Sequence, residues 1–541
     1  MPVRYAAWVA GGLWALIVWL PMSPQTTKQP SDALQSAASQ KFAALSDQFM
    51  KESLVLSPTG ASAAGYHIHV DPTVVVETIG NALFLPLTQT YAPHEVRVRQ
   101  VLSRVQQIPR LLDQVKPYLA DCDPIFITTA VQENAGNVDL IQSMLSQEIP
   151  AGSPLKAEYE QQAPRAIAAL NDFSRWLQDD LAKRPSKITW RLGKELYDRK
   201  FRLVMETPVT PEEVLSDAEQ DMKSVRAEML QIATPMHAHM YPEHGDHSDL
   251  SDHQRQNLII EEVLDKISDD HPRRDQLQQT IEADLAGIVQ FIREKKIVSL
   301  SARDNLKVIP TPPFERESYS VAGFHSAPPL DPQSDAEYWV TPIDPKMPDA
   351  KAESKLREYN NFTLQWLSIH EALPGHYIQF EHLNNIQPER RRLLRSLYAN
   401  GAYVEGWAEY IAQVVMDEGF LNNDPRFRMV MRKIRQRVIS NAILDIRMHT
   451  MDMTDQQAMD LMTKESFQTQ AEAEGKLQRA KLTSTQLPTY YVGIREWFEL
   501  RKEYQASAGK NFDLLKFHDL VLDAGPLPVP VVEKLVMTAA K

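Results

Sequence analysis

The sequence predicts a mainly α-helical fold. Glycine is scarce, with 19 residues among 541, whereas the good helix formers Ala, Leu, Glu, Gln and Arg are abundant. Apolar residues recur at the three- and four-residue spacing of amphipathic helices along most of the chain. No run of alternating apolar and polar residues is long enough to build a large sheet. We therefore expect helices throughout, with only a few short strands.

Five segments carry the clearest helical periodicity. In the first, Pro109 is expected to kink or split the helix, because proline cannot donate a backbone hydrogen bond. Pro164 suits the first position of the second helix, and Thr210 is a good N-cap before Pro211 in the third. The five expected helices cover residues 95–115, 164–181, 211–232, 275–294 and 454–473.

The first 45 residues predict export. Arg4 supplies a positive charge, and residues 5–20 form an uncharged stretch, shorter than the roughly 20 residues of a membrane span. Residues 1–22 are therefore interpreted as a signal peptide or an N-terminal membrane anchor, and the polar residues 23–45 as a flexible linker. We expect a periplasmic or secreted protein. The alternative is an inner-membrane anchor that leaves the protein facing the periplasm.

Residues 46–541 are expected to form one large helical domain, with an N-terminal lobe of about 46–305 and a C-terminal lobe of about 306–541. The net charge of −13 argues against a nucleic-acid partner, since such surfaces need clustered Lys and Arg. Cys122 is the single cysteine, which excludes an intramolecular disulfide and a cysteine-based metal site. A metal ion would therefore have to be held by histidines and carboxylates.

Two irregular stretches interrupt the helices. Residues 236–253 could capture a metal ion, but no ligand spacing defines a geometry there, so a mobile surface loop is the preferred interpretation. Residues 308–350 carry nine prolines, and the segment 337–341 within them has strand-like composition. A short edge strand there could bind an extended peptide beside Tyr338, or could simply pack. The histidines of the first stretch are His237, His239, His244, His247 and His253.

The segment His-Glu-Ala-Leu-Pro-Gly-His at 370–376 has the composition of a zinc site. His370 and His376 are candidate ligands, but six residues on a straight helix turn by roughly 240°, so the two rings would face different directions. Pro374 and Gly375 can break the helix and return His376 toward His370. Glu371 follows the first ligand and can act as general base on a zinc-bound water. A capped helix end with incidental histidines is the alternative.

The segment Glu-Gly-Trp-Ala-Glu-Tyr at 405–410 offers the acidic ligand. Glu405 and Glu409 lie four residues apart and face the same side of a helix. Glu405 is therefore the candidate third ligand, and Glu409 the candidate partner of a ligand histidine. An exposed acidic helix face is the alternative, but the apolar and aromatic neighbours indicate burial.

These segments resemble the domain-of-unknown-function 885 (DUF885) family, bacterial proteins related to gluzincin-type zinc metallopeptidases. The most specific match joins residues 370–376 with 405–408, and the similarity runs from about Phe49 to Val536. The resemblance implies a mostly helical fold with a deep central cleft, a few short strands near the active-site helix, and peptidase chemistry. Further matches lie at 192–197, 445–449, 489–493, 517–519 and 525–528.

The resemblance also has two departures and several implied residues. Tyr377 stands where the family usually has a second histidine, and Glu409 and Ala412 stand where it usually has Leu and an acid. The matching C-terminal segments imply that Tyr490, His449 or His518 stabilises the transition state, with Tyr490 the first choice. Arg447 or Arg501 is implied as the group that holds a substrate carboxylate.

The sequence thus predicts an exported, gluzincin-like metallopeptidase that uses one Zn²⁺ ion to hydrolyse oligopeptides. The domain 46–541 would be metallopeptidase-like, and the lobe 306–541 would bind the zinc. One alternative is a non-catalytic protein that binds metal or peptide. Another is a metal-dependent amidase or esterase acting on a non-peptide substrate, because the same metal chemistry attacks any suitable carbonyl.

Overall fold

The computed structural model describes residues 71–88, 91–119, 121–245, 247–311 and 322–539. The chain divides into two compact units, one ending at Trp190 and the other beginning at Arg191. The predicted lobe boundary near residue 305 is thus not where the division falls. The reason is that α10 (Pro211–Met240) packs along α18 (Pro425–Thr450), which ties the middle of the chain to its C-terminal part.

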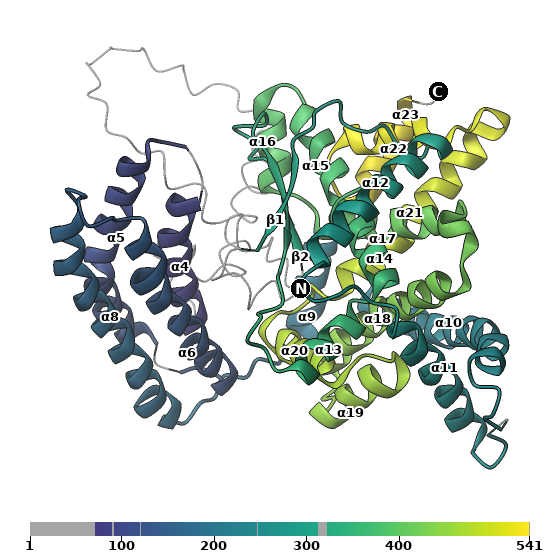
Figure 1. Ribbon diagram of the computed structural model, residues 1–541, viewed down its shortest axis with the longest axis horizontal. Helices are drawn as coiled ribbons and strands as arrows, with labels where there is room; N and C mark the ends of the chain where they lie inside the picture. Colours follow the sequence, from purple (N-terminus) through teal and green to yellow (C-terminus); the bar gives the residue numbers. More distant parts are fainter. Residues whose placement is uncertain (1–70, 89–90, 120, 246, 312–321, 540–541) are drawn as a thin grey trace, which may run out of the picture. The chain divides into compact units, whose positions relative to one another are not determined.

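The N-terminal unit is a helical bundle (Figure 1). Val98, Val101 and Leu102 of α5 are almost fully buried, as their helical spacing predicts. Two buried asparagines join helices: Asn137 donates to the Val76 carbonyl at 2.8 Å, and Asn134 donates to that of Leu170 at 2.7 Å. The helices are α4 (Pro72–Thr88), α5 (His94–Val115), α6 (Pro124–Asp139), α7 (Leu145–Gln147) and α8 (Lys156–Asp179), with a π turn at Leu140–Met144 and 3-10 turns at Lys116–Tyr118 and Leu181–Lys183.

Cys122 lies in this unit and is buried. Burial, reinforced by the charges of Asp71, Asp123 and Asp121, raises the pKa of its thiol to about 12. The thiol is therefore protonated at neutral pH.

The C-terminal unit begins with α9 (Gly193–Met205), α10, α11 (Asp252–Ser268) and α12 (Leu277–Lys295). Thr210 caps α10 through a reciprocal arrangement with Glu213, and Ser251 caps α11 through one with Gln254. A small sheet follows, in the order β1-β3-β2. Its strands are β1 (Leu306–Pro310), β2 (Ala322–His325) and β3 (Ala336–Val340), with β1 parallel and β2 antiparallel to β3.

The strand predicted at 337–341 is present as β3, but its predicted place at a sheet edge is wrong. Both sides of β3 are paired, Tyr338 lying opposite Val308 of β1 and Phe324 of β2. No backbone edge of β3 is left for an extended peptide, and the Tyr338 side chain is fully buried.

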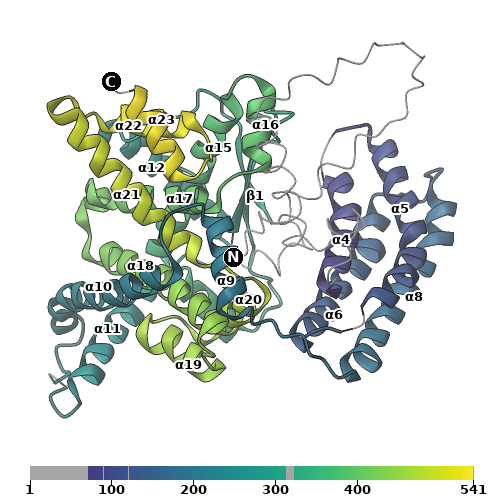
Figure 2. The same ribbon diagram turned by 180° about the vertical axis from the view of Figure 1, so that it is seen from behind.

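The remaining helices build the core of the C-terminal unit (Figure 2). Four of them, α14, α17, α18 and α21, pack against one another through nearly continuous buried faces. The helices after the sheet, besides α18, are α13 (Asp349–Glu358), α14 (Asn361–Glu371), α15 (His376–Asn385), α16 (Glu389–Leu397), α17 (Gly401–Asp417), α19 (Asp455–Asp460), α20 (Gln470–Leu482), α21 (Pro488–Ala508), α22 (Leu514–Ala524) and α23 (Val529–Ala539), with a π turn at Leu461–Glu465 and 3-10 turns at Phe420–Asn423 and Gly509–Asn511.

Helices α17 and α21 cross where each of them has a glycine, Gly406 in α17 and Gly493 in α21. A Cβ placed on Gly406 would lie 2.6 Å from the Gly493 Cα, and a Cβ on Gly493 would lie 2.0 Å from the Ala402 carbonyl oxygen. Only glycine fits at either position, because the two backbones touch there. This contact fixes how α21 approaches the residues that α17 carries.

The prediction of a mainly α-helical fold is confirmed, with three short strands in the described residues. The predicted signal segment and linker, residues 1–45, lie outside the described residues. Within those residues, no helix combines the length and apolarity of a membrane span.

Candidate metal centre

The two candidate histidine ligands lie on either side of a break between helices. Helix α14 ends at Glu371, and α15 begins at His376. The helix break predicted at Pro374 and Gly375 is therefore present. A Cβ on Gly375 would lie 1.9 Å from the His370 carbonyl oxygen, so only glycine lets the turn fold back onto α14. The folded-back turn brings the two imidazoles to a centroid separation of 5.0 Å, nearly perpendicular to each other.

Glu405 reaches the same point from α17. Its Oε2 atom lies 3.6 Å from Nε2 of His376 and 3.8 Å from Nε2 of His370. All three side chains are deeply buried, with exposures of 2–5%. A tetrahedral ion with ligand bonds of about 2.0–2.1 Å holds neighbouring donor atoms roughly 3.3–3.5 Å apart. The observed spacing is close to that value.

The buried polar atoms at this point lack protein partners. Nε2 of His376 and Oε2 of Glu405 accept or donate no hydrogen bond within the described part of the chain. Leaving buried polar atoms unsatisfied costs roughly 1–3 kcal/mol each. A cation bound between these atoms would satisfy them together, so the donor set fits one divalent metal ion.

Glu409 lies behind His370. Its Oε1 atom is 3.5 Å from Nδ1 of His370, one helical turn along α17 from Glu405. A carboxylate at this position can hold the ring so that Nε2 faces the ligand cluster. Burial, reinforced by the charge of Glu405, raises the pKa of Glu409 to about 7, although Arg437 opposes the shift.

Glu371 is the last residue of α14 and is buried beside the ligands. Burial raises the pKa of its carboxyl to about 7; the neighbouring His376 lowers this pKa and Glu405 raises it. A carboxyl that titrates near neutral pH can both accept and return a proton. Burial lowers the pKa of His370 well below its usual value, so this ring is neutral, as a metal ligand must be.

Trp407 connects the acidic helix to the helix break, which the sequence did not indicate. Its indole Nε1 donates to the carbonyl oxygens of Pro374 and Gly375, both at 3.1 Å. The side chain that follows Glu405 by two residues thus holds the turn that positions His376. Nothing in the residue pattern identifies backbone carbonyls as the partners of this ring.

Tyr490 is the one predicted transition-state group that lies near the ligands. It is carried by α21, and the Glu405 charge adds to burial in raising the pKa of its hydroxyl. The phenol is therefore a permanent proton donor at neutral pH. Its oxygen is 3.5 Å from the Arg479 guanidinium. The glycine crossing of α17 and α21 explains this proximity.

His449 and His518 are engaged elsewhere in the core. The Nε2 atom of His449 is 2.9 Å from the Ala480 carbonyl oxygen, and its ring stacks on Tyr197. His518 uses both ring nitrogens, one with the Tyr410 hydroxyl at 2.8 Å and one with the Ile297 carbonyl at 2.6 Å. Burial lowers its pKa to about 3. The structure therefore does not bring His518 to the metal centre.

The predicted substrate-binding arginines also lie apart from the ligands. Arg447 pairs with Glu219 at 2.7 Å, both side chains being partly exposed. Arg501 lies beside Tyr410. Burial raises the pKa of the Tyr410 hydroxyl, and the charge of Arg501 lowers it. Tyr338 does lie near the centre: its hydroxyl is 3.5 Å from the Ser368 hydroxyl, and the Glu371 charge contributes to its raised pKa.

A group of buried basic side chains beside Glu409 was missed from the sequence. Arg437 lies 3.2 Å from the Glu472 carboxylate and stacks on Trp366 at 4.9 Å. Burial lowers the pKa of Lys476 to about 7, with Arg479 and Arg437 adding to the effect. These residues come from α18 and α20, and no motif marks them as neighbours.

The family model for DUF885, described as bacterial protein of unknown function, matches residues 24–536. The chain belongs to the DUF885 family. A search of curated proteins finds no match. The resemblance drawn from the motifs at 370–376 and 405–408 is therefore confirmed for the family itself.

Two solved structures of bacterial proteins are similar to this DUF885 chain. A candidate lipoprotein of unknown function from Shewanella oneidensis is 30% identical, with a TM-score of 0.74, covering 94% of this chain and 89% of that one. A candidate lipoprotein from Colwellia psychrerythraea is 16% identical, with a TM-score of 0.66, covering 84% and 78% of the two chains. The second similarity concerns the fold alone.

Proposed function

We propose that this DUF885 protein is a zinc-dependent hydrolase, and specifically a gluzincin-like metallopeptidase that cleaves oligopeptides. One observation carries the proposal: buried donor atoms of His370, His376 and Glu405 converge on one point beside a further carboxyl, Glu371. Among the described residues, the donor atoms of His376 and Glu405 have no hydrogen-bond partner. Two histidines, one acid and a free glutamate are the inventory that such enzymes need.

The proposed roles follow from position. Zn²⁺ held by His370, His376 and Glu405 would supply Lewis-acid chemistry to a water molecule and to the scissile carbonyl. Glu371 would accept a proton from the water molecule as the water oxygen attacks the carbonyl carbon. It would then give that proton to the nitrogen as the C–N bond breaks. The pKa of about 7 that burial gives Glu371 suits both steps.

Tyr490 would stabilise the oxyanion that forms on the carbonyl. Its hydroxyl stays protonated, is close enough to Glu405 for that charge to raise its pKa, and lies 3.5 Å from Arg479. A preorganised donor of this kind typically contributes about 2.7–4 kcal/mol to the transition state. Arg479 replaces Arg447 and Arg501 as the candidate for holding a substrate carboxylate, because it alone contacts Tyr490.

The metal centre is enclosed by α14, α15 and α17, and its ligands have exposures of 2–5%. Substrate would need these walls to part, which favours short, flexible peptides over folded proteins. The same burial favours the alternative of a non-catalytic metal- or peptide-binding protein. An amidase or esterase reaction would use the same residues.

We also propose that the protein is exported, with residues 1–22 as signal peptide or anchor. The description of the Shewanella oneidensis relative as a candidate lipoprotein supports export. The uncharged stretch at 5–20 supports it independently.

The test compares metal content and hydrolysis of a peptide library in wild type and in Glu371→Gln. We expect the variant to retain one ion at the centre and to lose at least a hundredfold in kcat, because the proton acceptor is gone. Glu389→Gln is the matched control, since that side chain is 67% exposed. Full activity in Glu371→Gln would overturn the assignment. Ester or amide turnover without peptide cleavage would identify the alternative substrate class.

A further inference from the structure

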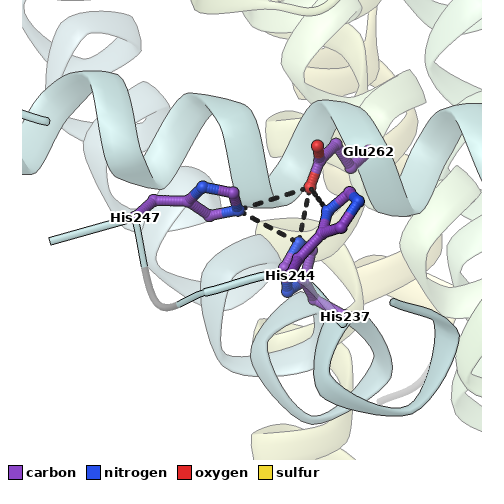
Figure 3. Close-up of side chains that lie close together, drawn as sticks. All are labelled: His237, His244, His247 and Glu262. Carbon is purple, nitrogen blue, oxygen red and sulfur yellow. Dashed lines mark hydrogen bonds and ion pairs between the residues drawn. The ribbon is translucent and has the colours of Figure 1, made fainter. Parts of the chain in front are cut away.

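A second group of ligand-type side chains lies in the C-terminal unit, on the hairpin formed by α10 and α11. We call it the hairpin histidine cluster: His237, His244, His247 and Glu262. His237 is in the last turn of α10, His244 and His247 are in the connection, and Glu262 is in α11. Figure 3 shows the four side chains pointing toward one another.

Three imidazoles surround one carboxylate oxygen. Oε2 of Glu262 lies 2.5 Å from Nε2 of His237, 3.3 Å from Nδ1 of His244 and 3.5 Å from Nε2 of His247. The Nε2 atoms of His237 and His247 are 3.4 Å apart. All four donor atoms lie within 4.8 Å of one another.

The spacing matches a tetrahedral metal site. Donors held at about 2.0–2.1 Å from a tetrahedral ion are roughly 3.3–3.5 Å apart. Of the six separations among the four donors, three lie between 3.3 and 3.5 Å, and the one between His237 and Glu262 needs to open by a small side-chain shift. In the metal-free state the three imidazoles can donate to Oε2 of Glu262, and the same ring nitrogens become ligands once they are deprotonated.

Neighbouring contacts hold the ligands in place. Tyr241 stacks on the His244 ring at 4.6 Å, and its hydroxyl donates to the Glu262 backbone carbonyl at 3.0 Å. The side chains of His237, His247 and Glu262 are 9%, 17% and 22% exposed, and that of His244 is 39% exposed. The cluster is thus ordered by packing yet open to an ion from solvent.

We propose that the hairpin histidine cluster binds a second divalent transition-metal ion, and that this ion is Zn²⁺. Three imidazoles and one carboxylate complete a tetrahedron and leave no coordination position for water, which is the pattern of a structural site. By binding residues of α10, of α11 and of the segment between them, the ion would hold this connecting segment against both helices. This site is independent of the one formed by His370, His376 and Glu405.

The test titrates the chelator-stripped full-length protein with Zn²⁺ or Co²⁺ and measures bound metal per chain. We expect two metal ions per chain for wild type, one for His247→Ala and one for Glu405→Gln. His239→Ala is the matched control, since His239 is exposed on α10 and outside the cluster, and it should bind as wild type does.

The comparison between wild type and His247→Ala isolates this site from the first. A difference of one equivalent supports the hairpin site even if Glu405→Gln binds as much metal as wild type, a result that would refute the first site alone. Equal binding by wild type, His247→Ala and the second variant His244→Ala overturns the hairpin site. Circular dichroism confirms that the variants are folded.

A readout independent of stoichiometry follows the hairpin itself. Zn²⁺ should slow proteolysis of the connection 241–250 in wild type and in His239→Ala, because the ion fixes both of its ends. The same ion should give no protection in His247→Ala. Protection of that variant to the wild-type extent would contradict the proposal.

Discussion

At the scale of single residues, the Trp407 indole and the Gly375 backbone determine the shape of the metal centre. The indole holds two carbonyl oxygens of the turn, and the glycine lets that turn approach His370. Neither group is a ligand. Both act by fixing where His376 lies relative to Glu405.

We expect Trp407→Phe to weaken metal binding. Loss of the indole N–H removes a donor from the Pro374 carbonyl and leaves the Gly375 carbonyl with the Gln379 N–H at 3.2 Å, which costs roughly 1–3 kcal/mol in the free energy of unfolding. Because the turn then moves more freely, Zn²⁺ affinity should fall about tenfold or more. Denaturant unfolding and Zn²⁺ titration measure the two effects.

The control is Trp497→Phe, which removes a similar buried hydrogen bond. Trp497 packs on the Trp407 ring at 5.0 Å, but its Nε1 donates to the Tyr403 carbonyl of α17 at 3.1 Å and not to the turn. This variant should lose similar stability and keep its Zn²⁺ affinity. Equal losses of affinity in both variants would show that Trp407 acts only through general stability.

That His370, His376 and Glu405 lie together could be predicted from sequence, because histidines and acids at fixed spacing constrain the possible chemistry directly. The helix break was predictable for the same reason, since Pro374 and Gly375 are unambiguous backbone signals. The partners of Trp407 were not, because they are backbone atoms. Glu262 was also missed as a partner of His237, His244 and His247, since it lies in α11, 15 residues beyond His247.

At the scale of elements, the crossing of α17 and α21 brings the helix that carries Tyr490 against the helix that carries Glu405. The crossing depends on Gly406 and Gly493, whose backbones are in contact. A side chain at either position would separate the helices.

We expect Gly493→Ala to destabilise the protein by at least about 1–3 kcal/mol, the usual cost of overpacking a core. The same change should lower kcat through displacement of Tyr490. Gly475→Ala in α20 is the control: nothing lies within 4 Å of its added Cβ, so it should stabilise the fold by about 0.5–1 kcal/mol. Wild-type stability in Gly493→Ala would contradict the crossing.

The sequence predicted which segments form helices better than it predicted where those helices begin and end. The α10 boundary at Pro211 follows from its Thr210 cap, as expected. Pro109 does not split α5, and Pro164 does not begin α8, because both helices continue through these prolines with good helix formers on either side. The expected helix 454–473 is instead interrupted by a π turn at Leu461–Glu465. Strand β3 was recognised by composition, but its central place depends on β1 and β2, which composition does not specify.

At the scale of the whole molecule, one buried carboxyl should make stability depend on pH. Burial raises the pKa of Asp284 in α12 to about 7, although a hydrogen bond from Gln365 opposes the shift. The folded state therefore holds this proton more tightly than the unfolded chain, where the pKa is about 3.9. Its contribution to stability is complete below pH 4 and is lost as pH rises through 7.

We accordingly expect Asp284→Asn to raise the free energy of unfolding at pH 8 by up to about 4 kcal/mol, since each unit between the folded and unfolded pKa is worth about 1.36 kcal/mol. Near pH 4 the variant and wild type should be equally stable, since the aspartic acid is then protonated in the fold. Denaturant unfolding at both pH values measures the difference. A stability gap that is the same at pH 4 and pH 8 would contradict the shift.

The buried thiol of Cys122 makes this protein convenient for spectroscopy. With a pKa of about 12, that sulfur is hardly ever a thiolate at pH 7 and reacts slowly with maleimide or methanethiosulfonate reagents. Cysteines introduced on exposed helix faces would thus be labelled selectively, with no native residue to remove. A spin or fluorescent label pair, one before and one after Trp190, would then follow movement between the units as peptide or metal is added.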